Sequence, residues 1–147
     1  MADPYFQLPP PKSTGREYFN LAWLNAYLEK VGTPIQPVDI QATLLLLTAQ
    51  SIVDAIKIYG PDTEEILVCG GGVHNKRLMK AISTTAQKQF TSTVETLSTE
   101  MRGVNPDYME SMGFAWLAMQ TLERKPGNLP SVTGARKEAV LGAVYYP

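Results

Sequence analysis

The chain has 147 residues, of which 44% are hydrophobic and 18% charged, a composition typical of a globular domain and not of a disordered chain. Its formal net charge of −1 provides no basic field, so we expect no nucleic-acid partner. The single cysteine, Cys69, excludes an intrachain disulfide and a multi-cysteine zinc site. We expect Cys69 to be a small buried hydrophobe at the end of an apolar segment.

The sequence carries no clear signal for export or membrane insertion. Its N-terminal residues lack the basic-then-apolar order of a signal peptide. The longest apolar run, four leucines at 44–47, is too short to span a membrane. We therefore expect a single soluble domain over residues 1–147, located in the cytoplasm and without a membrane partner.

The first third of the chain predicts two helices. Residues 1–13 are rich in proline and should be irregular. Thr14 and Glu17 have the spacing of a capping box, which predicts a helix over residues 15–31. Asp39 can cap a second, strongly apolar helix that runs to about Tyr59.

The remainder of the chain alternates strands and helices. The apolar run EILVC predicts an interior strand, and STVETLS at 92–98 predicts a second. Asn75 can cap a helix between them. Asn105 can cap a last helix that has Pro106 at its first position and ends at Lys125. The turn-rich tail ends in a β-like segment at 139–146.

This order of elements predicts an α/β fold with parallel strands. Two or three strands bury little surface on their own, so we expect the chain to belong to something larger. The missing partner surface and the leucine-rich helix also predict exposed apolar surface, and hence self-association as a homodimer.

Three consecutive glycines, Gly70 to Gly72, stand where the first strand meets the following helix. A strand, glycine-rich turn and helix bring free backbone N–H groups and the positive end of a helix dipole to one point, which favours a phosphate or another polar ligand. A Walker A loop is excluded because no Gly-Lys-Ser/Thr follows. Gly70 and Gly72 fit half of a dinucleotide fingerprint, and Glu95 stands where its ribose-binding acid is expected. A purely structural turn explains the glycines about as well.

The segment EILVCGGGVHNKRLM resembles the adenosine motif of the sugar kinase, Hsp70 and actin superfamily. Together with DPYFQLPPPKSTGREYFNLAWL, NPDYMESMGFAWLA and GNLPSVTGARKEAVLGAVYYP, it resembles the C-terminal half of the anhydro-N-acetylmuramic acid kinases. The resemblance runs from residue 3 to residue 147. It implies the C-terminal lobe of a ribonuclease H-like, actin-like ATPase fold, with a mixed sheet flanked by helices.

The resemblance also implies a reaction. ATP, with Mg²⁺, phosphorylates O6 of 1,6-anhydro-N-acetylmuramic acid while water opens the anhydro bridge, a step of peptidoglycan recycling. The phosphate-binding loops and the catalytic carboxylate base belong to an N-terminal lobe that is absent here, so we expect no catalytic residue in this chain. We expect the isolated lobe to be inactive as a kinase, or else to serve as a non-catalytic binding or structural module.

Site candidates follow from the resemblance. Gly70, Gly71, Gly72 and Asn75 are the nucleotide-binding candidates, although Asn75 can be only a helix cap. Glu110 is the substrate-binding candidate for the sugar hydroxyls, with a favourable helix-dipole contact as the alternative. We predict no metal site, because His74 is the only histidine and lacks a second ligand beside it.

Overall fold

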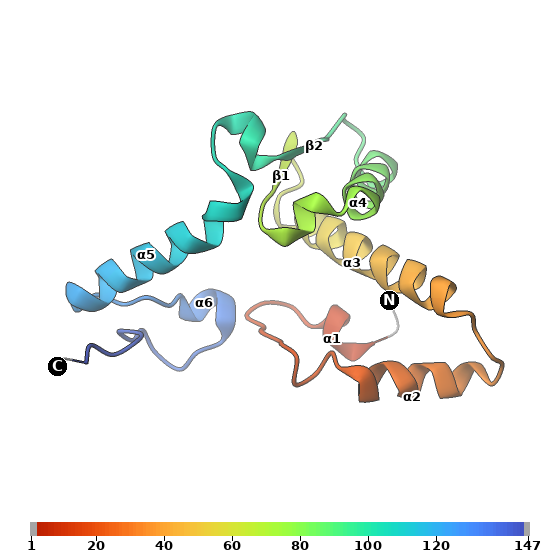
Figure 1. Cartoon of the computed structure of the whole chain (residues 1–147), viewed down its shortest axis with the longest axis horizontal. Coiled ribbons are helices and arrows are strands. Elements are labelled where there is room, and N and C mark those ends of the chain that lie inside the picture. The colour runs from red at the N-terminus through yellow and green to blue at the C-terminus, as the bar shows by residue number, and fades with distance from the viewer. Residues whose placement is uncertain (1–2, 146–147) are drawn as a thin grey trace. The chain divides into compact units, whose positions relative to one another are not determined.

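The computed structural model describes residues 3–145, which form two compact units (Figure 1). One unit contains residues 36–112. The other combines the segments on either side, up to Ile35 and from Gly113. We describe the two units separately.

The unit of residues 36–112 is a small α/β layer structure. Helix α3 (Pro37–Tyr59) is followed by strand β1 (Glu65–Val68), helix α4 (Lys76–Gln89) and strand β2 (Glu95–Ser98). The two strands pair in parallel, with Glu65 opposite Glu95 and Val68 opposite Ser98. The parallel α/β arrangement is confirmed. The described sheet has only these two strands, so the expectation of a mixed sheet is wrong for residues 3–145.

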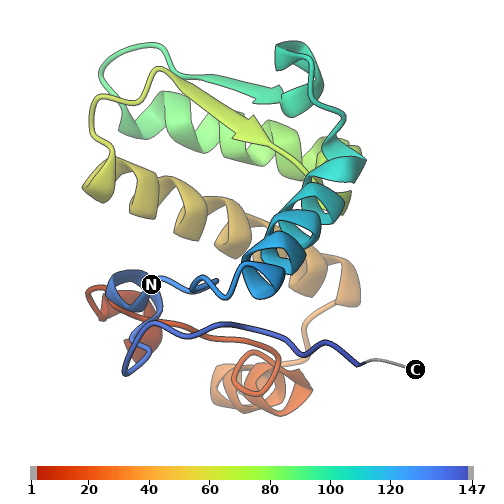
Figure 2. The same ribbon diagram turned by 90° about the vertical axis from the view of Figure 1, so that its left-hand side faces the viewer.

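The core of this unit lies between the sheet and helices α3 and α4, which lie on the same face of the sheet (Figure 2). Ala49 and Val53 of α3 and Ala86 of α4 are fully buried, and Ile82 is 1% exposed. They pack with Ile66 of β1 and with Val94. Leu67, which points to the other face of β1, is 42% exposed. Parallel sheets are normally covered on both faces, whereas within residues 36–112 the packing of α3 and α4 buries only the face that carries Ile66.

By length and composition alone, helix α3 could cross a membrane. The run of four leucines at 44–47 is only a small part of this helix, so it did not indicate this property. The same features occur in core helices of water-soluble proteins. Ala49 and Val53 form a buried seam against α4, while Val38 and Leu46 are 66% and 57% exposed. Packing within the α/β layer therefore accounts for part of its apolar surface.

The helix boundaries show which caps form. Asn75 caps α4 as predicted, since its side chain accepts hydrogen bonds from the amides of Arg77 and Leu78. Helix α3 ends at Tyr59 as predicted but begins at Pro37, so the prediction that Asp39 is the cap is wrong. Proline at the first helical position needs no N–H partner and has its φ angle already set for the helix.

Three short 3-10 helices complete this unit: η1 (Gly71–His74), η2 (Thr99–Arg102) and η3 (Pro106–Tyr108). Asn105 caps η3 through a 2.9 Å hydrogen bond from the amide of Asp107. Helix α5 (Met109–Leu122) follows directly and ends three residues before the predicted Lys125. The cap at Asn105 and the helical position of Pro106 are thus confirmed, although the first turn is 3-10.

The second unit begins with helix α1 (Pro4–Gln7), so the prediction of an irregular segment over residues 1–13 is wrong at this point. Residues 1 and 2 lie outside the described part of the chain. Helix α2 (Leu21–Val31) starts six residues later than the predicted helix. Asn20 caps it by accepting a 3.0 Å hydrogen bond from the amide of Trp23. Gly32, with φ 71°, ends it where expected.

After α5, the second unit folds back on itself through short helix α6 (Pro130–Thr133) and a tail. The amide of Gly127 donates to the carbonyl of Ala139 over 3.0 Å. The Asn128 side chain bonds the Lys137 carbonyl and the Ala139 amide. The predicted strand at 139–146 is absent from residues 139–145, and Tyr146 lies outside the described residues.

Candidate functional site

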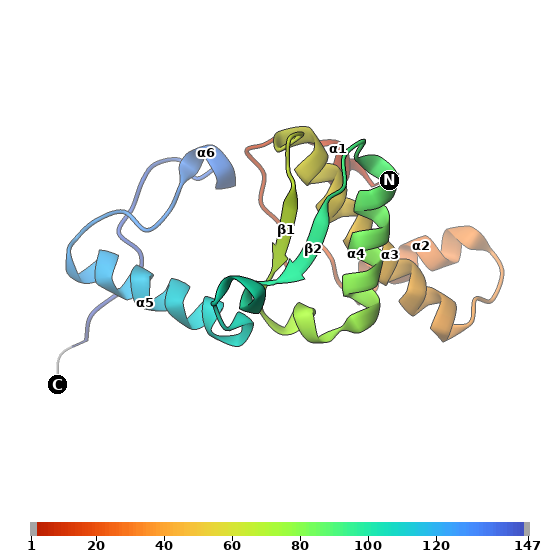
Figure 3. The same ribbon diagram turned by 90° about the horizontal axis from the view of Figure 1, so that it is seen from above.

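The glycine turn follows β1 directly, at the edge where both parallel strands end (Figure 3). Gly70 has φ 70° and ψ −171°, a backbone conformation that is essentially restricted to glycine. Its amide donates a 2.9 Å hydrogen bond to the carbonyl of Pro106. Gly70 is therefore required by the fold itself.

Gly71 and Gly72 have no such internal reason to be glycine. Both belong to the 3-10 helix η1, and neither has a positive φ. A Cβ built on Gly71 would meet nothing within 4 Å, and one on Gly72 would make only an ordinary 3.6 Å contact with Leu78. No hydrogen bond joins either amide to another residue within the described part of the chain, as expected for the first N–H groups of a helical segment. Two adjacent N–H groups, at the exposed Gly71 and the half-buried Gly72, therefore have no hydrogen-bond partner within residues 3–145.

Asn75 is held mainly as a helix cap. Its side-chain oxygen accepts two hydrogen bonds of 3.1 Å from the first turn of α4. This leaves the side-chain NH₂ group for any further contact, so a nucleotide role for Asn75 stays a prediction.

Glu110 lies beside the glycine turn. It is the second residue of α5, it is exposed, and its Oε1 atom is 3.9 Å from the Cβ position built on Gly70. The structure thus brings the predicted nucleotide-binding turn and the predicted sugar-binding carboxylate to the same edge of the sheet, although the sequence separates them by 40 residues.

A side-chain pair near this edge was missed from the sequence. The imidazole Nε2 of His74, the last residue of η1, is 2.7 Å from Oδ1 of Asp107 in η3. Among residues 3–145 no group of three or more His, Cys, Asp or Glu side chains could hold a metal ion. The predicted cap at Asn105 placed Asp107 in the first turn of the last helix, but nothing in the sequence indicated that His74 would be its partner.

The dinucleotide interpretation loses its main support. Glu95 is the first residue of β2 and pairs with Glu65, the first residue of β1. In a parallel sheet both residues lie at the edge where the strands begin, whereas the glycine turn follows the other end. A ribose-binding acid has to lie beside the turn, so the assignment of Glu95 to this role is wrong.

The structure also places Cys69 and Lys12. Cys69 is exposed, so the prediction that it is a buried hydrophobe is wrong for this structure. It follows the last residue of β1, where burial ends along with the strand. Lys12 is used locally: its Nζ donates to the Tyr5 carbonyl over 3.2 Å and lies 4.8 Å from the centre of the Tyr5 ring.

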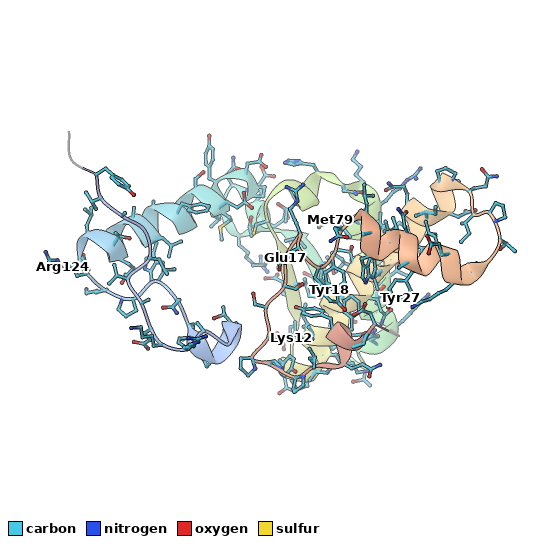
Figure 4. All side chains as sticks on the ribbon, turned by 90° about the horizontal axis from the view of Figure 1, so that it is seen from below. Lys12, Glu17, Tyr18, Tyr27, Met79 and Arg124 are labelled. Carbon is cyan, nitrogen blue, oxygen red and sulfur yellow. The ribbon has the colours of Figure 1, made fainter. Side chains whose placement is uncertain are left out.

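A buried carboxylate organises the start of the second unit. Asp3 is 5% exposed and accepts hydrogen bonds from the Trp23 indole (2.8 Å), the Tyr5 amide (2.9 Å) and the hydroxyls of Tyr18 and Tyr27 (each 3.0 Å), of which the two tyrosines are labelled in Figure 4. Burial raises the pKa of Asp3, but these hydrogen bonds outweigh it and hold the pKa below its ordinary value. The hydrogen bond to Asp3 in turn raises the pKa of Tyr18.

A groove runs between α3 and α4, lined by apolar α3 residues such as Leu45 and by Arg77, Lys80 and Lys88 of α4. It includes Asn75 but none of the three glycines. The groove therefore reaches the turn region at Asn75 but does not include Gly70, Gly71, Gly72 or Glu110.

Comparison with known proteins decides the family. The sequence model of the anhydro-N-acetylmuramic acid kinases matches residues 1–147. The chain belongs to this family. It is 51% identical over 146 residues to an anhydro-N-acetylmuramic acid kinase of Coxiella burnetii and 54% identical over 143 residues to one of Xylella fastidiosa. A relative of the same name from Saccharophagus degradans is 49% identical over 144 residues.

These alignments cover nearly the whole chain but only part of each relative. They include 99%, 97% and 98% of this chain, against 37%, 36% and 37% of the respective relatives. The chain thus spans a little over a third of the length of the curated kinases that it matches. The α/β layer with its small parallel sheet is consistent with part of a sugar kinase.

Proposed function

We propose that this chain is the nucleotide- and sugar-binding C-terminal lobe of an anhydro-N-acetylmuramic acid kinase. The complete enzyme would use ATP to phosphorylate O6 of 1,6-anhydro-N-acetylmuramic acid while water opens the anhydro bridge, giving N-acetylmuramic acid 6-phosphate in the cytoplasm. Family membership over the whole chain, and the name shared by relatives about 50% identical, support this proposal.

The observation that carries the nucleotide assignment is the glycine pair at 71 and 72. Glycine reduces stability unless a geometric demand requires it. No atom of the described structure makes that demand at Gly71. A ligand that approaches the backbone closely would make it, and the unpartnered N–H groups there suit a phosphate or a ribose hydroxyl. Gly70 would then shape the turn while Gly71 and Gly72 contact the nucleotide.

Glu110 would bind the sugar. It is exposed and its carboxylate lies at the same edge as the turn, so it can accept hydrogen bonds from sugar hydroxyls while the phosphates lie over the glycines. The residues that this structure describes do not provide a metal site by themselves. Mg²⁺ in proteins is commonly held by phosphate oxygens and one or two carboxylates. We therefore place the Mg²⁺ of the reaction on the nucleotide phosphates and on groups from the rest of the kinase.

We further propose that the two strands belong to a larger, ribonuclease H-like sheet in the complete lobe. A two-stranded parallel sheet with Leu67 exposed on one face lacks both the strands and the covering layer that such sheets need. The exposed apolar side chains of α3, including Val38 and Leu46, would make the isolated chain self-associate. Sedimentation of the chain over a range of concentrations tests this.

The proposal predicts that the 147-residue chain alone does not turn over ATP, because the catalytic base and the phosphate loops would come from the N-terminal lobe. A coupled ADP-release assay with 1,6-anhydro-N-acetylmuramic acid measures this. Normal turnover by the purified chain would show that the catalytic groups are present here, contrary to the proposal.

The nucleotide site is tested by the variant Gly71→Leu. Because a side chain at this position points into open space, the variant should fold and melt like the wild type. It should nevertheless lose ATP binding, since the side chain would fill the space proposed for the ligand. Cys69→Ser, an exposed change one residue before the turn, is the matched control and should bind ATP normally. Equal ATP binding by Gly71→Leu and the wild type would remove the turn from the site.

A further inference from the structure

His74 and Asp107 join the two segments that form the candidate site. Their 2.7 Å contact connects the end of η1 with η3, across 33 positions of sequence. The side chains are 62% and 54% exposed. Exposed pairs of this kind add little to stability, so global stability does not explain the contact.

Among residues 3–145, the contact is the second of two hydrogen bonds between these segments. The first is the backbone hydrogen bond from Gly70 to Pro106, at the beginning of the turn. A single hydrogen bond would let the turn pivot about that point. The His74 contact, four residues later, fixes the turn at its other end. Gly71 and Gly72 lie between the two attachment points.

Both partners are themselves held by helix caps. Asn75, directly after His74, caps α4, and Asn105 caps the segment that contains Asp107. Asp107 precedes Glu110 by three residues, at the entrance to α5. The pair therefore links the beginning of α4 to the beginning of α5, close to the glycine turn and to Glu110, whose Oε1 is 3.9 Å from the Cβ position of Gly70.

We propose that His74 and Asp107 are positioning residues that set the distance between the glycine turn and Glu110. This distance would determine how far apart the nucleotide and the sugar are bound. The proposal rests on the proposed function of this site. Neither residue is assigned a contact with the reacting atoms. Their role is to keep Gly71 and Gly72 aligned with the carboxylate that holds the sugar.

The unit contains a matched control pair. Arg102 of η2 is paired with Glu65 of β1, also through exposed or half-buried side chains, and its Nε donates to Oε2 over 3.2 Å. Among the described residues, no hydrogen bond or ion pair joins either side chain to the glycine turn. Arg102→Ala therefore removes a comparable charge pair from the same unit without removing an attachment of the turn.

Amide hydrogen exchange of Gly70, followed by NMR on the 147-residue chain, tests the proposal without any ligand. Loss of the second attachment should let the bond from Gly70 to Pro106 open more often. His74→Ala and Asp107→Ala should each speed exchange of the Gly70 amide about two- to fivefold, the range that an exposed pair supplies, and the double variant should add nothing further. His74→Gln retains an N–H donor and should restore slow exchange. The melting temperatures of the His74 and Asp107 variants should stay close to that of the wild type. The Arg102→Ala control should leave the exchange rate of the Gly70 amide unchanged. Unchanged Gly70 exchange in both alanine variants would overturn the proposal.

A ligand experiment separates this proposal from the proposed function. In the wild-type chain, bound ATP should strengthen binding of 1,6-anhydro-N-acetylmuramic acid. His74→Ala should lose this coupling while the affinity for each ligand alone changes little. If the wild-type chain binds neither ligand, the proposed function fails for the isolated chain, and the exchange rates still decide whether the pair positions the turn. Full coupling retained in His74→Ala would overturn the positioning role.

Discussion

Replacing Gly70 by alanine should destabilise the unit of residues 36–112 by about 1–2 kcal/mol. The φ of 70° and ψ of −171° lie in a region that costs other residues about 1–3 kcal/mol. Alanine recovers about 0.4–1 kcal/mol by restricting the unfolded chain. Steric clash adds little, because the nearest atom to the new Cβ, Oε1 of Glu110, is at an ordinary contact distance of 3.9 Å.

Gly71→Ala is the matched comparison one residue later. Its Cβ meets nothing within 4 Å and its φ is not positive, so only the effect on the unfolded chain remains. This variant should be neutral or more stable by up to about 1 kcal/mol. Urea unfolding followed by far-UV circular dichroism measures both variants. Equal destabilisation by the two substitutions would refute the separation between a glycine that the fold requires and one that it does not.

Three further substitutions test other parts of the account. Ile82→Ala should cost about 2–5 kcal/mol in urea unfolding, since this side chain is 1% exposed in a small core; a loss below about 1 kcal/mol would contradict that packing. Asp3→Asn should cost about 1–3 kcal/mol, because its amide has one acceptor oxygen in place of two, and the NH₂ group cannot accept from the half-buried Trp23 and Tyr27 donors. Because the folded-state pKa of Asp3 is lowered, its stabilisation is complete above the ordinary aspartate pKa and is lost as the pH falls through the folded-state value. Acid unfolding of wild type and variant should therefore converge at low pH, and parallel curves would contradict the assignment. Gly113→Ala should stabilise α5 by about 0.5–1 kcal/mol, because nothing lies within 4 Å of the new methyl group; a loss of helix stability in thermal melts would reveal a contact there.

Local signals predicted much of the α/β unit. The side chains of Asn75 and Asn105 make the expected caps, and glycine ends α2 and α3 at the expected residues. The capping box at Thr14 failed because Asn20 offers a competing cap. Tyr18 and Phe19, which would have been in the first two turns, pack against Tyr5 instead.

Non-local features could not be read from the chain. The alternating residues near 140 have the composition of a strand, but a strand needs a neighbour, and the described tail instead bonds back to Gly127 and Asn128. The register of β1 and β2, which places Glu95 away from the turn, depends on pairing across 30 residues. The contact between His74 and Asp107 is likewise a product of the fold. By contrast, the resemblance to the kinase family rested on whole sequence segments, and the family match confirmed it.

The most direct measurement is an NMR titration of the ¹⁵N-labelled chain with ATP, with NAD as the competing dinucleotide. The account predicts that the amide signals of Gly71 and Gly72 shift first and most with ATP, while NAD leaves them in place. Signals from the groove between α3 and α4 should move less. ATP-induced shifts confined to that groove, or no shift at the glycine amides at millimolar ATP, would contradict the assignment of the turn as the nucleotide site.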